Sequence, residues 1–423
     1  MLGNVAIWGM VMYNVRKAQY IVVNHYFMEA TILKKLISII LFVFITGVLS
    51  GCSKAGGYYN NGRKSLASGD YEEAAKYLMS AISENPNRAN YYIDYGMALI
   101  GQGRYDEAIS QFDQVIMDKK ILMVLQNNKQ ALRGRGIAYF SMSNYREAIN
   151  QFDKALDISV LSELNMDILY YKGKALMAIG DYNGAIDTYT KLIEEFGEDA
   201  QVLGERAYTY QKIGEYEKGL DDFDKAIALE DDNFDYYFGK YYLLKDLDRH
   251  HDAQEVLRRA AEIKIDTKSD KFNLAKIHFY QGLYDQALAE LGESFTDGFS
   301  ESYLYIGEIY NEKKDYSTAK YYYETYIEEG GAINPSAYNQ IASLLIKMED
   351  YDQALPYLEE GISLYKNTRQ NNVMRVLQKN EIIVYEYLGM FDKALNKLQA
   401  YVATYPKDEE AKRELAFIKS RLE

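Results

Sequence analysis

A small residue recurs along this chain at intervals close to 34 residues. An aromatic residue or His stands three positions before it, and Leu, Phe or Tyr stands four positions after it. Ten copies keep this register, with the small residue at Ala74, Ala108, Ala148, Ala185, Gly219, Ala253, Ala287, Ala319, Ala354 and Ala394. One such unit cannot bury its apolar face alone, so a fixed period of this length predicts stacked copies.

Each copy predicts two helices joined by a short turn. Residues 92–99 and 105–115 both place apolar residues at i, i+3, i+4 and i+7, and Gly103 separates them. A second small residue lies twelve positions before the first, as Gly96 does before Ala108. Small residues at both sites would let the two helices pack closely. Asp or Asn is expected to cap the second helix at Asp70, Asn144, Asp181, Asp315 and Asp350.

This pattern resembles the tetratricopeptide repeat, whose 34-residue unit has an aromatic, Gly and Tyr in its first helix and Ala-x3-Phe in its second. The resemblance covers residues 58–406. It implies an all-α fold, an α-solenoid wound as a right-handed superhelix from about ten helix-turn-helix repeats. Residues 407–423 form a polar pattern with a narrow apolar stripe, which predicts a C-terminal capping helix.

The chain before the repeats predicts export. Residues 1–27 match nothing downstream, so we interpret them as a non-native upstream extension and expect translation to start at Met28. Residues 28–51 have the pattern of a lipoprotein signal peptide, with two lysines before an uncharged apolar run (36–50) that is short for a membrane span.

The end of this segment, Leu49-Ser50-Gly51-Cys52, resembles the bacterial lipoprotein lipobox. The resemblance implies cleavage before Cys52 and a diacylglycerol on its sulfur. The alternative is that Cys52 is a small apolar residue at the end of an ordinary signal or membrane anchor. Residues 52–57 are expected to be the lipidated cysteine and a short flexible tether.

Catalytic and metal-binding patterns are sparse. The sequence has no HExxH, CxxC, phosphate-binding Gly-rich loop or GxSxG motif, and His250 and His251 are expected in a solvated turn. We therefore predict no enzyme activity, no cofactor and no metal site. Because acidic residues outnumber basic ones by 62 to 48, nucleic-acid binding is also not expected.

Ten first-helix positions suggest where a partner would bind. In the repeat family, inward-pointing positions of the first helices line a groove for an extended or helical segment of another protein. The matching residues are apolar or aromatic: Tyr59, Ile93, Met97, Ile137, Phe140, Tyr170, Tyr208, Phe238, Tyr242 and Phe272. The alternative is that they pack between neighbouring repeats.

Two connections, 117–130 and 364–378, are longer than the family norm. Their apolar residues at helical spacing predict extended helices, and their basic residues, which include Lys119, Lys120 and Lys129, are expected on solvated faces.

Together these features predict a non-catalytic scaffold or adaptor that binds a protein or peptide in the bacterial cell envelope. It would be exported and lipid-anchored to the cytoplasmic membrane or, where one exists, the outer membrane. Alternatives are an envelope assembly factor, a lipoprotein that binds a glycan or small ligand, and a cytoplasmic co-chaperone, which lipidation of Cys52 would exclude. The oligomeric state and the identity of the partner stay open.

Overall fold

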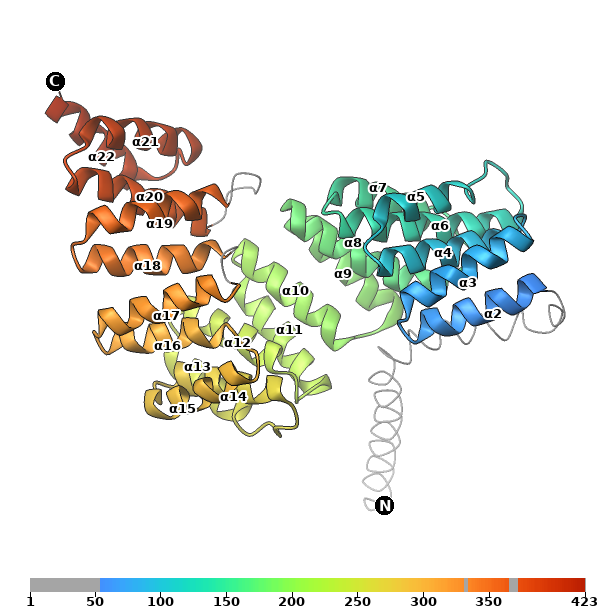
Figure 1. The fold of residues 1–423 in the computed structure, drawn as a ribbon, viewed down its shortest axis with the longest axis horizontal. Helices are drawn as coiled ribbons and strands as arrows, with labels where there is room; N and C mark the ends of the chain where they lie inside the picture. The colour runs from blue at the N-terminus through green and yellow to red at the C-terminus, as the bar shows by residue number, and fades with distance from the viewer. Residues whose placement is uncertain (1–53, 331–333, 365–371, 423) are drawn as a thin grey trace, which may run out of the picture. The chain divides into compact units, whose positions relative to one another are not determined.

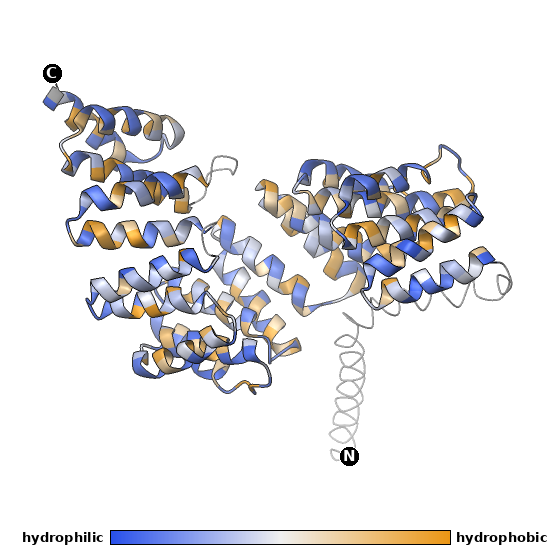
Figure 2. Cartoon of the chain, viewed as in Figure 1, coloured by the Kyte–Doolittle hydropathy of each residue, from blue (hydrophilic) through white to orange (hydrophobic). Residues whose placement is uncertain are grey.

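The computed structural model describes residues 54–330, 334–364 and 372–422, and this part of the chain is helical with no strand (Figure 1). Figure 2 shows hydrophobic and hydrophilic residues alternating along these helices, as amphipathic helices require. The helices are α2 (Lys54–Ala67), α3 (Tyr71–Glu84), α4 (Ala89–Gly101), α5 (Tyr105–Asp113), α6 (Leu122–Ser141), α7 (Tyr145–Leu156), η1 (Ser162–Leu164), α8 (Asn165–Ile179), α9 (Tyr182–Phe196), α10 (Ala200–Ile213), α11 (Tyr216–Leu229), α12 (Phe234–Asp246), α13 (His250–Ala260), α14 (Lys268–Tyr280), α15 (Tyr284–Thr296), α16 (Ser302–Glu312), α17 (Tyr316–Glu328), α18 (Pro335–Lys347), α19 (Tyr351–Ser363), α20 (Asn372–Tyr387), α21 (Phe391–Thr404) and α22 (Glu409–Leu422).

The chain divides into two compact units, unit 1 up to His250 and unit 2 from His251. Unit 1 contains five helix pairs, α2/α3 to α10/α11, followed by α12. Unit 2 contains all but the first residue of α13, four pairs from α14/α15 to α20/α21, and α22. Within each unit, every pair packs on the next one along the chain. This confirms the expected all-α arrangement of stacked helix-turn-helix repeats.

Glycine at the predicted packing site brings the two helices of a pair together. A Cβ on Gly96 would lie 2.6 Å from the ring of Phe112, which is fully buried. The same site in the next copy gives 2.3 Å, between Gly136 and the ring of Phe152. Real Cβ atoms do not approach so closely, so the second-helix aromatic fills the space that a side chain on the first helix would occupy.

A left-handed residue makes the turn inside every repeat. Gly103 is the middle residue of the α4–α5 turn and has φ of +75°, a conformation that suits glycine. A positive φ recurs two positions before the aromatic or His that starts each second helix, at Gly69, Gly103, Ser143, Gly180, Gly214, Asp248, Gly282, Lys314, Glu349 and Gly389. The turn therefore keeps one geometry even where the residue is not glycine.

Four of the five predicted helix caps are confirmed. The side chains of Asp70, Asp181, Asp315 and Asp350 each accept a hydrogen bond from the backbone N–H three residues later. Asn144 was expected to do the same, but its side chain makes no such bond.

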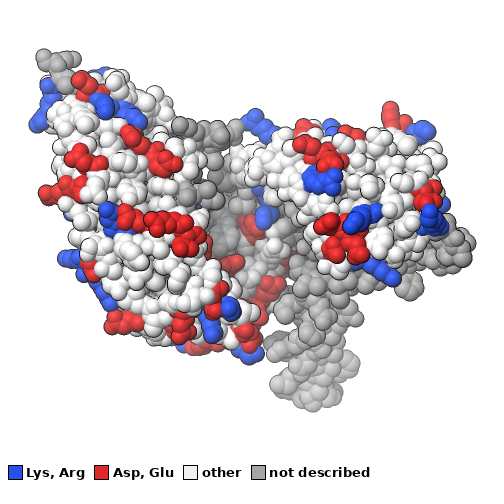
Figure 3. All heavy atoms as spheres, viewed as in Figure 1, with Lys and Arg blue, Asp and Glu red and all other residues white. Residues whose placement is uncertain are grey.

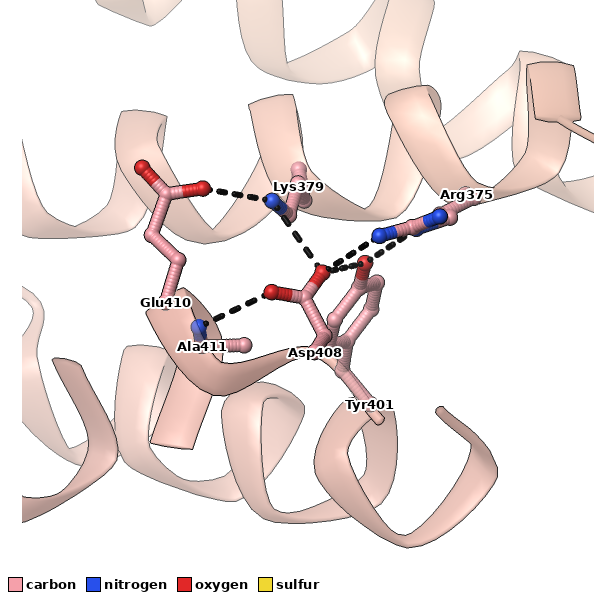
Figure 4. A network of polar contacts seen from close by, with 6 residues as sticks. All are labelled: Arg375, Lys379, Tyr401, Asp408, Glu410 and Ala411. Carbon is pink, nitrogen blue, oxygen red and sulfur yellow. Dashed lines mark hydrogen bonds and ion pairs between the residues drawn. The ribbon is translucent and has the colours of Figure 1, made fainter. Parts of the chain in front are cut away.

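The final helix, α22, packs on α21 through Ala411 and Ile418, which are buried, as the apolar stripe predicts. Asp408 fixes its start (Figure 4). The carboxylate of Asp408 accepts hydrogen bonds from the Arg375 guanidinium (2.9 Å), the Tyr401 hydroxyl (2.8 Å) and the backbone N–H of Ala411 (3.2 Å). Lys379 lies 3.2 Å from the same carboxylate. Helices α20, α21 and α22 are thus joined at one buried carboxylate.

The structure corrects two expectations near the N-terminus and in the long connections. Residues 54–57 were expected in a flexible tether, but α2 already begins at Lys54. Lys129 was expected on a solvated face, yet it is fully buried. Its ammonium donates to the Ile158 carbonyl oxygen (2.8 Å) and to Asn165 Oδ1 (2.6 Å), which ties α6 to the connection that leads to α8. Residues 1–53, Cys52 included, lie outside the described part.

Candidate protein-binding surface

Polar side chains join neighbouring first helices of unit 1. Arg63 of α2 lies 3.6 Å from Asp94 of α4, and Lys174 of α8 lies 3.1 Å from Glu205 of α10. Arg133 of α6 pairs in the same way with a carboxylate of α8. Each cation has a carboxylate partner on the next first helix, so the fixed charge along this row is largely compensated.

Tyrosine hydroxyls extend this row. The Tyr170 hydroxyl accepts from Gln201 (2.7 Å) and donates to Glu205 (3.2 Å), and the Tyr208 hydroxyl donates to the Asp235 carbonyl oxygen (3.0 Å). Burial, followed by the charge of Glu205, raises the pKa of Tyr170 above its ordinary value, so its hydroxyl is neutral across the physiological range. These phenols act as hydrogen-bonding groups and as flat apolar surface.

The first helices of unit 2 carry a comparable row of polar contacts. Lys347 of α18 donates to Asn311 of α16 (3.1 Å), and Asn380 of α20 donates to Asn339 of α18 (3.0 Å). First-helix faces in both units therefore present hydrogen-bonding groups in place of a continuous apolar strip.

Half of the residues predicted to line a groove are buried, which corrects that prediction for them. They are Tyr59, Ile93, Ile137, Phe238 and Phe272, each no more than 9% exposed. Their surroundings explain this, because Tyr59 packs against Tyr91 with ring centroids 4.6 Å apart and Phe272 stacks on Phe299 at 5.0 Å. These residues hold neighbouring helices together, as the packing alternative expects.

The other five predicted residues retain some exposed surface. Met97, Phe140, Tyr170 and Tyr208 are half-buried, and Tyr242 is 39% exposed. Tyr208 and Tyr242 lie on α10 and α12, both in unit 1. The accessible part of the predicted site is therefore a few aromatic side chains beside the polar row, and its use in partner binding stays a prediction.

A second accessible apolar feature spans the end of the connection between α5 and α6 and the first two residues of α6, where the residue pattern predicted an extended helix throughout. Residues 117–123, Met-Asp-Lys-Lys-Ile-Leu-Met, are exposed without interruption. Met117, Ile121, Leu122 and Met123 are 48–68% exposed. The available signal was a run of five adjacent apolar residues (121–125) directly after two lysines. The first three of these are exposed, and consecutive exposed apolar residues are unusual without a function.

Metal sites and membrane spans have characteristic geometries that can be compared with the described residues. Among them, no cluster of three or more His, Cys, Asp or Glu side chains has the geometry of a metal site. His250 and His251 lie at the start of α13 with exposed side chains, each 3.6–3.9 Å from a neighbouring Asp. Within the same ranges, no helix is long and apolar enough to cross a membrane.

The distribution of charge is relevant to whether the surface could bind a nucleic acid. On the face of the molecule in Figure 3, acidic and basic side chains of the described residues are interspersed, and acidic ones are prominent. A nucleic-acid surface needs a concentrated basic stripe to displace counterions.

Family models of the tetratricopeptide repeat match residues 65–120, 133–200, 200–233, 301–329 and 335–368. The chain is a tetratricopeptide repeat protein. A TPR repeat-containing protein of Methanocaldococcus jannaschii is 23% identical to it over 328 residues, covering 71% of this chain and 55% of that protein. TPR repeat-containing protein YpiA of Bacillus subtilis is 24% identical over 207 residues, covering 47% of each chain.

Two further similarities bear on this tetratricopeptide repeat protein. The Hsp70-Hsp90 organizing protein of Triticum aestivum is 26% identical over 197 residues, covering 40% of this chain and 34% of that protein. The chain thus spans about half or less of the length of these curated relatives. The crystal structure of yeast Tom70 superposes with a TM-score of 0.53 at 15% identity, covering 94% of this chain and 93% of that one, which shows a common fold.

Proposed function

We propose that this tetratricopeptide repeat protein is a non-catalytic scaffold or adaptor, exported and anchored by a lipid on Cys52 in the bacterial cell envelope. The proposal rests on one observation, the short distance in sequence between a lipobox-like motif and the first repeat. A lipobox-like motif ends at Cys52, and the repeat array begins two residues later at Lys54. A lipid on that cysteine would tether the array to a membrane without a spanning segment.

The repeat array supports the binding role. Tetratricopeptide repeats generally mediate protein–protein interactions, and one relative is named for organising Hsp70 and Hsp90. The polar row along the first helices of unit 1 offers hydrogen bonds at regular spacing, and its charges are paired. We therefore expect a protein segment recognised by hydrogen bonds and aromatic contacts more than by net charge.

The anchor is tested with the full-length chain, tagged at its C-terminus, in a bacterial host that processes lipoproteins. Wild-type protein should fractionate with membranes, and Cys52→Ala should not be processed. Cys52 is the only cysteine, so the mature wild-type protein should resist labelling by a maleimide even when denatured, because its sulfur is alkylated. A freely reactive Cys52 in the exported protein would contradict lipidation.

The partner is tested by crosslinking and mass spectrometry on the anchored protein. Tyr242→Ala should reduce the yield of a captured protein, because the aromatic contact beside the polar row is lost. Tyr321→Ala is the matched control, since Tyr321 is another exposed tyrosine, at 63%, in a second helix of unit 2. Equal capture by both variants would argue against binding at the first helices of unit 1, and capture of no protein would favour the glycan or small-ligand alternative.

A further inference from the structure

The exposed connection between α5 and α6 lies at the end of unit 1 where α2 begins. Lys54, the first residue of α2, forms an ion pair with Glu84 at the end of α3, 2.5 Å away. Because the helices of each pair are antiparallel, starts of first helices and ends of second helices gather at one edge of the stack. Figure 1 shows the α5–α6 connection at that same end. We call this end of unit 1 the entry edge.

The chain outside the structure also arrives at the entry edge. Cys52 is two residues from Lys54, so the chain restricts it to about 7 Å from the start of α2. The first helices α2, α4 and α6 are successive neighbours, and two interhelical steps amount to about 20 Å. Any lipid on Cys52 therefore brings a bilayer surface within reach of the connection that precedes α6.

The chemistry of this connection suits a lipid surface. Residues 117–123, which we call the apolar loop, place Lys119 and Lys120 between Met117 and the exposed Ile121, Leu122 and Met123. Figure 2 shows hydrophobic residues on both sides of the hydrophilic tip of this connection. Apolar side chains that enter the interface, flanked by lysines that meet anionic headgroups, are the composition of interfacial membrane segments.

The apolar loop is also held in place at its base. The Asn128 side chain accepts from the backbone N–H of Met117 (3.0 Å) and donates to the Met117 carbonyl oxygen (2.7 Å). Asn128 is itself buried on α6. Two hydrogen bonds to one residue fix where the exposed segment leaves the body of unit 1, so its apolar side chains are presented at a set position.

Charge along the entry edge changes with distance from α2. The α3–α4 connection carries Arg88 and no acidic residue, and the apolar loop carries two lysines and one aspartate. The connections farther along, 157–164, 197–199 and 230–233, carry only acidic charges: Asp157, Glu163, Glu198, Asp199, Glu230, Asp231 and Asp232. An anionic surface would attract the near part of the edge and repel the far part.

We propose that the entry edge of unit 1 docks on the membrane that carries the anchor, with the apolar loop inserted among the lipid headgroups. This inference rests on the proposed lipid anchor at Cys52. The near connections touch the bilayer and the acidic ones are turned away from it. Docking fixes the orientation of unit 1 relative to the membrane. A lipid anchor alone would leave unit 1 free to rotate.

The test compares two residues at opposite ends of one helix. Leu122 begins α6 and Met142 follows its last residue, about 30 Å away for a helix of 20 residues. Both are exposed, at 60% and 40%. Leu122→Cys and Met142→Cys are each made in the full-length lipidated protein, labelled with bimane and reconstituted in phosphatidylethanolamine–phosphatidylglycerol vesicles that contain brominated acyl chains.

We expect loss of bimane fluorescence at position 122, a blue shift of its emission, and an unchanged signal at position 142. Replacing Lys119 and Lys120 by Glu should restore the fluorescence at 122 while the protein still floats with the vesicles. Unquenched labels at both positions in floating protein would overturn docking and leave the anchor intact. Protein that does not float with the vesicles would overturn the anchor and docking together. Crosslinking of position 122 to a second copy would make the loop a self-association surface and overturn the proposal.

Discussion

Glu386→Gln is expected to strengthen the packing of α22 at alkaline pH. Glu386 lies on α20, half-buried, and its Oε1 atom is buried without a hydrogen-bond partner among the described residues. Burial, followed by the negative charge of Glu414 on α22, raises the pKa of Glu386 to about 7. Near neutral pH, the native state therefore holds a proton on this carboxyl that the unfolded chain releases.

The magnitude follows from the size of the shift. The ordinary pKa is 4.5, and a rise to about 7 corresponds to roughly 3 kcal/mol if the site were fully buried. Solvent screening at a half-buried site reduces this to about 1–2 kcal/mol. The folded-state pKa is raised, so the stabilising contribution is complete below the ordinary pKa and is lost as the pH rises through about 7.

Hydrogen exchange can measure the stability of α22 separately from that of the other helices. A local measurement is needed because a repeat array need not unfold as one unit. Amide protection in α22, corrected for intrinsic exchange rates, is measured at about pH 4.5 and about pH 8.5, which spans the ordinary and the raised pKa of Glu386. The wild type should lose about 5–30-fold in protection over this interval, and Glu386→Gln should lose much less.

Glu409→Gln provides the control, because Glu409 begins α22 with a side chain 70% exposed and pairs with Lys412. It should keep the wild-type pH dependence. The reasoning is refuted if the wild type and Glu386→Gln lose the same protection between the two pH values.

Three further changes test other parts of the fold. Asp408→Asn should destabilise α22 by about 2–3 kcal/mol through weakened hydrogen bonds to Arg375 and Tyr401, read as increased hydrogen exchange. The neighbouring Arg375 guanidinium holds the pKa of Asp408 well below its usual range, so the wild type should lose this contribution only as the pH falls below about 4. Gly134→Ala should destabilise unit 1 by about 1–3 kcal/mol, because its Cβ would lie 2.3 Å from the Phe112 ring; an unchanged urea midpoint would contradict this packing. Lys314→Gly should stabilise unit 2 by about 0.5–1 kcal/mol, since Lys314 has φ of +61°, and a lower melting temperature would speak against relief of strain there.

The repeat architecture was predictable because it rests on local spacing. The small residue at Ala108, the turn at Gly103 and the packing site at Gly96 all act within one helix pair, and each is visible as a fixed offset in the sequence. Their structural roles, buried contact, left-handed turn and close approach to Phe112, match the expectation. At these positions the spacing of the residues and their conformational preferences favour the same structure. Tertiary contacts therefore do not override the local pattern.

The candidate binding site was less predictable because it depends on how one repeat covers the next. Tyr59 and Phe238 match positions that face inward in the family, yet both are buried. The cover comes from residues more than one helix away, such as Tyr91 over Tyr59. Lys129 shows the same effect, because its hydrogen-bond acceptors, Ile158 and Asn165, lie 29 and 36 residues further along the chain.

The left-handed turns have a consequence for protein engineering. Within each repeat of unit 1 the two helices are separated by only two or three residues with a fixed geometry, whereas successive repeats are separated by three to eight residues. An epitope tag or a reporter peptide inserted at Gly103 would break a turn that both helices of the pair depend on. The same insertion beside Pro86, in the α3–α4 connection, lengthens a segment that is already variable in size. We therefore expect unit 1 to tolerate insertions in the connections between repeats, because these connections can be lengthened without changing the helix pair of any repeat.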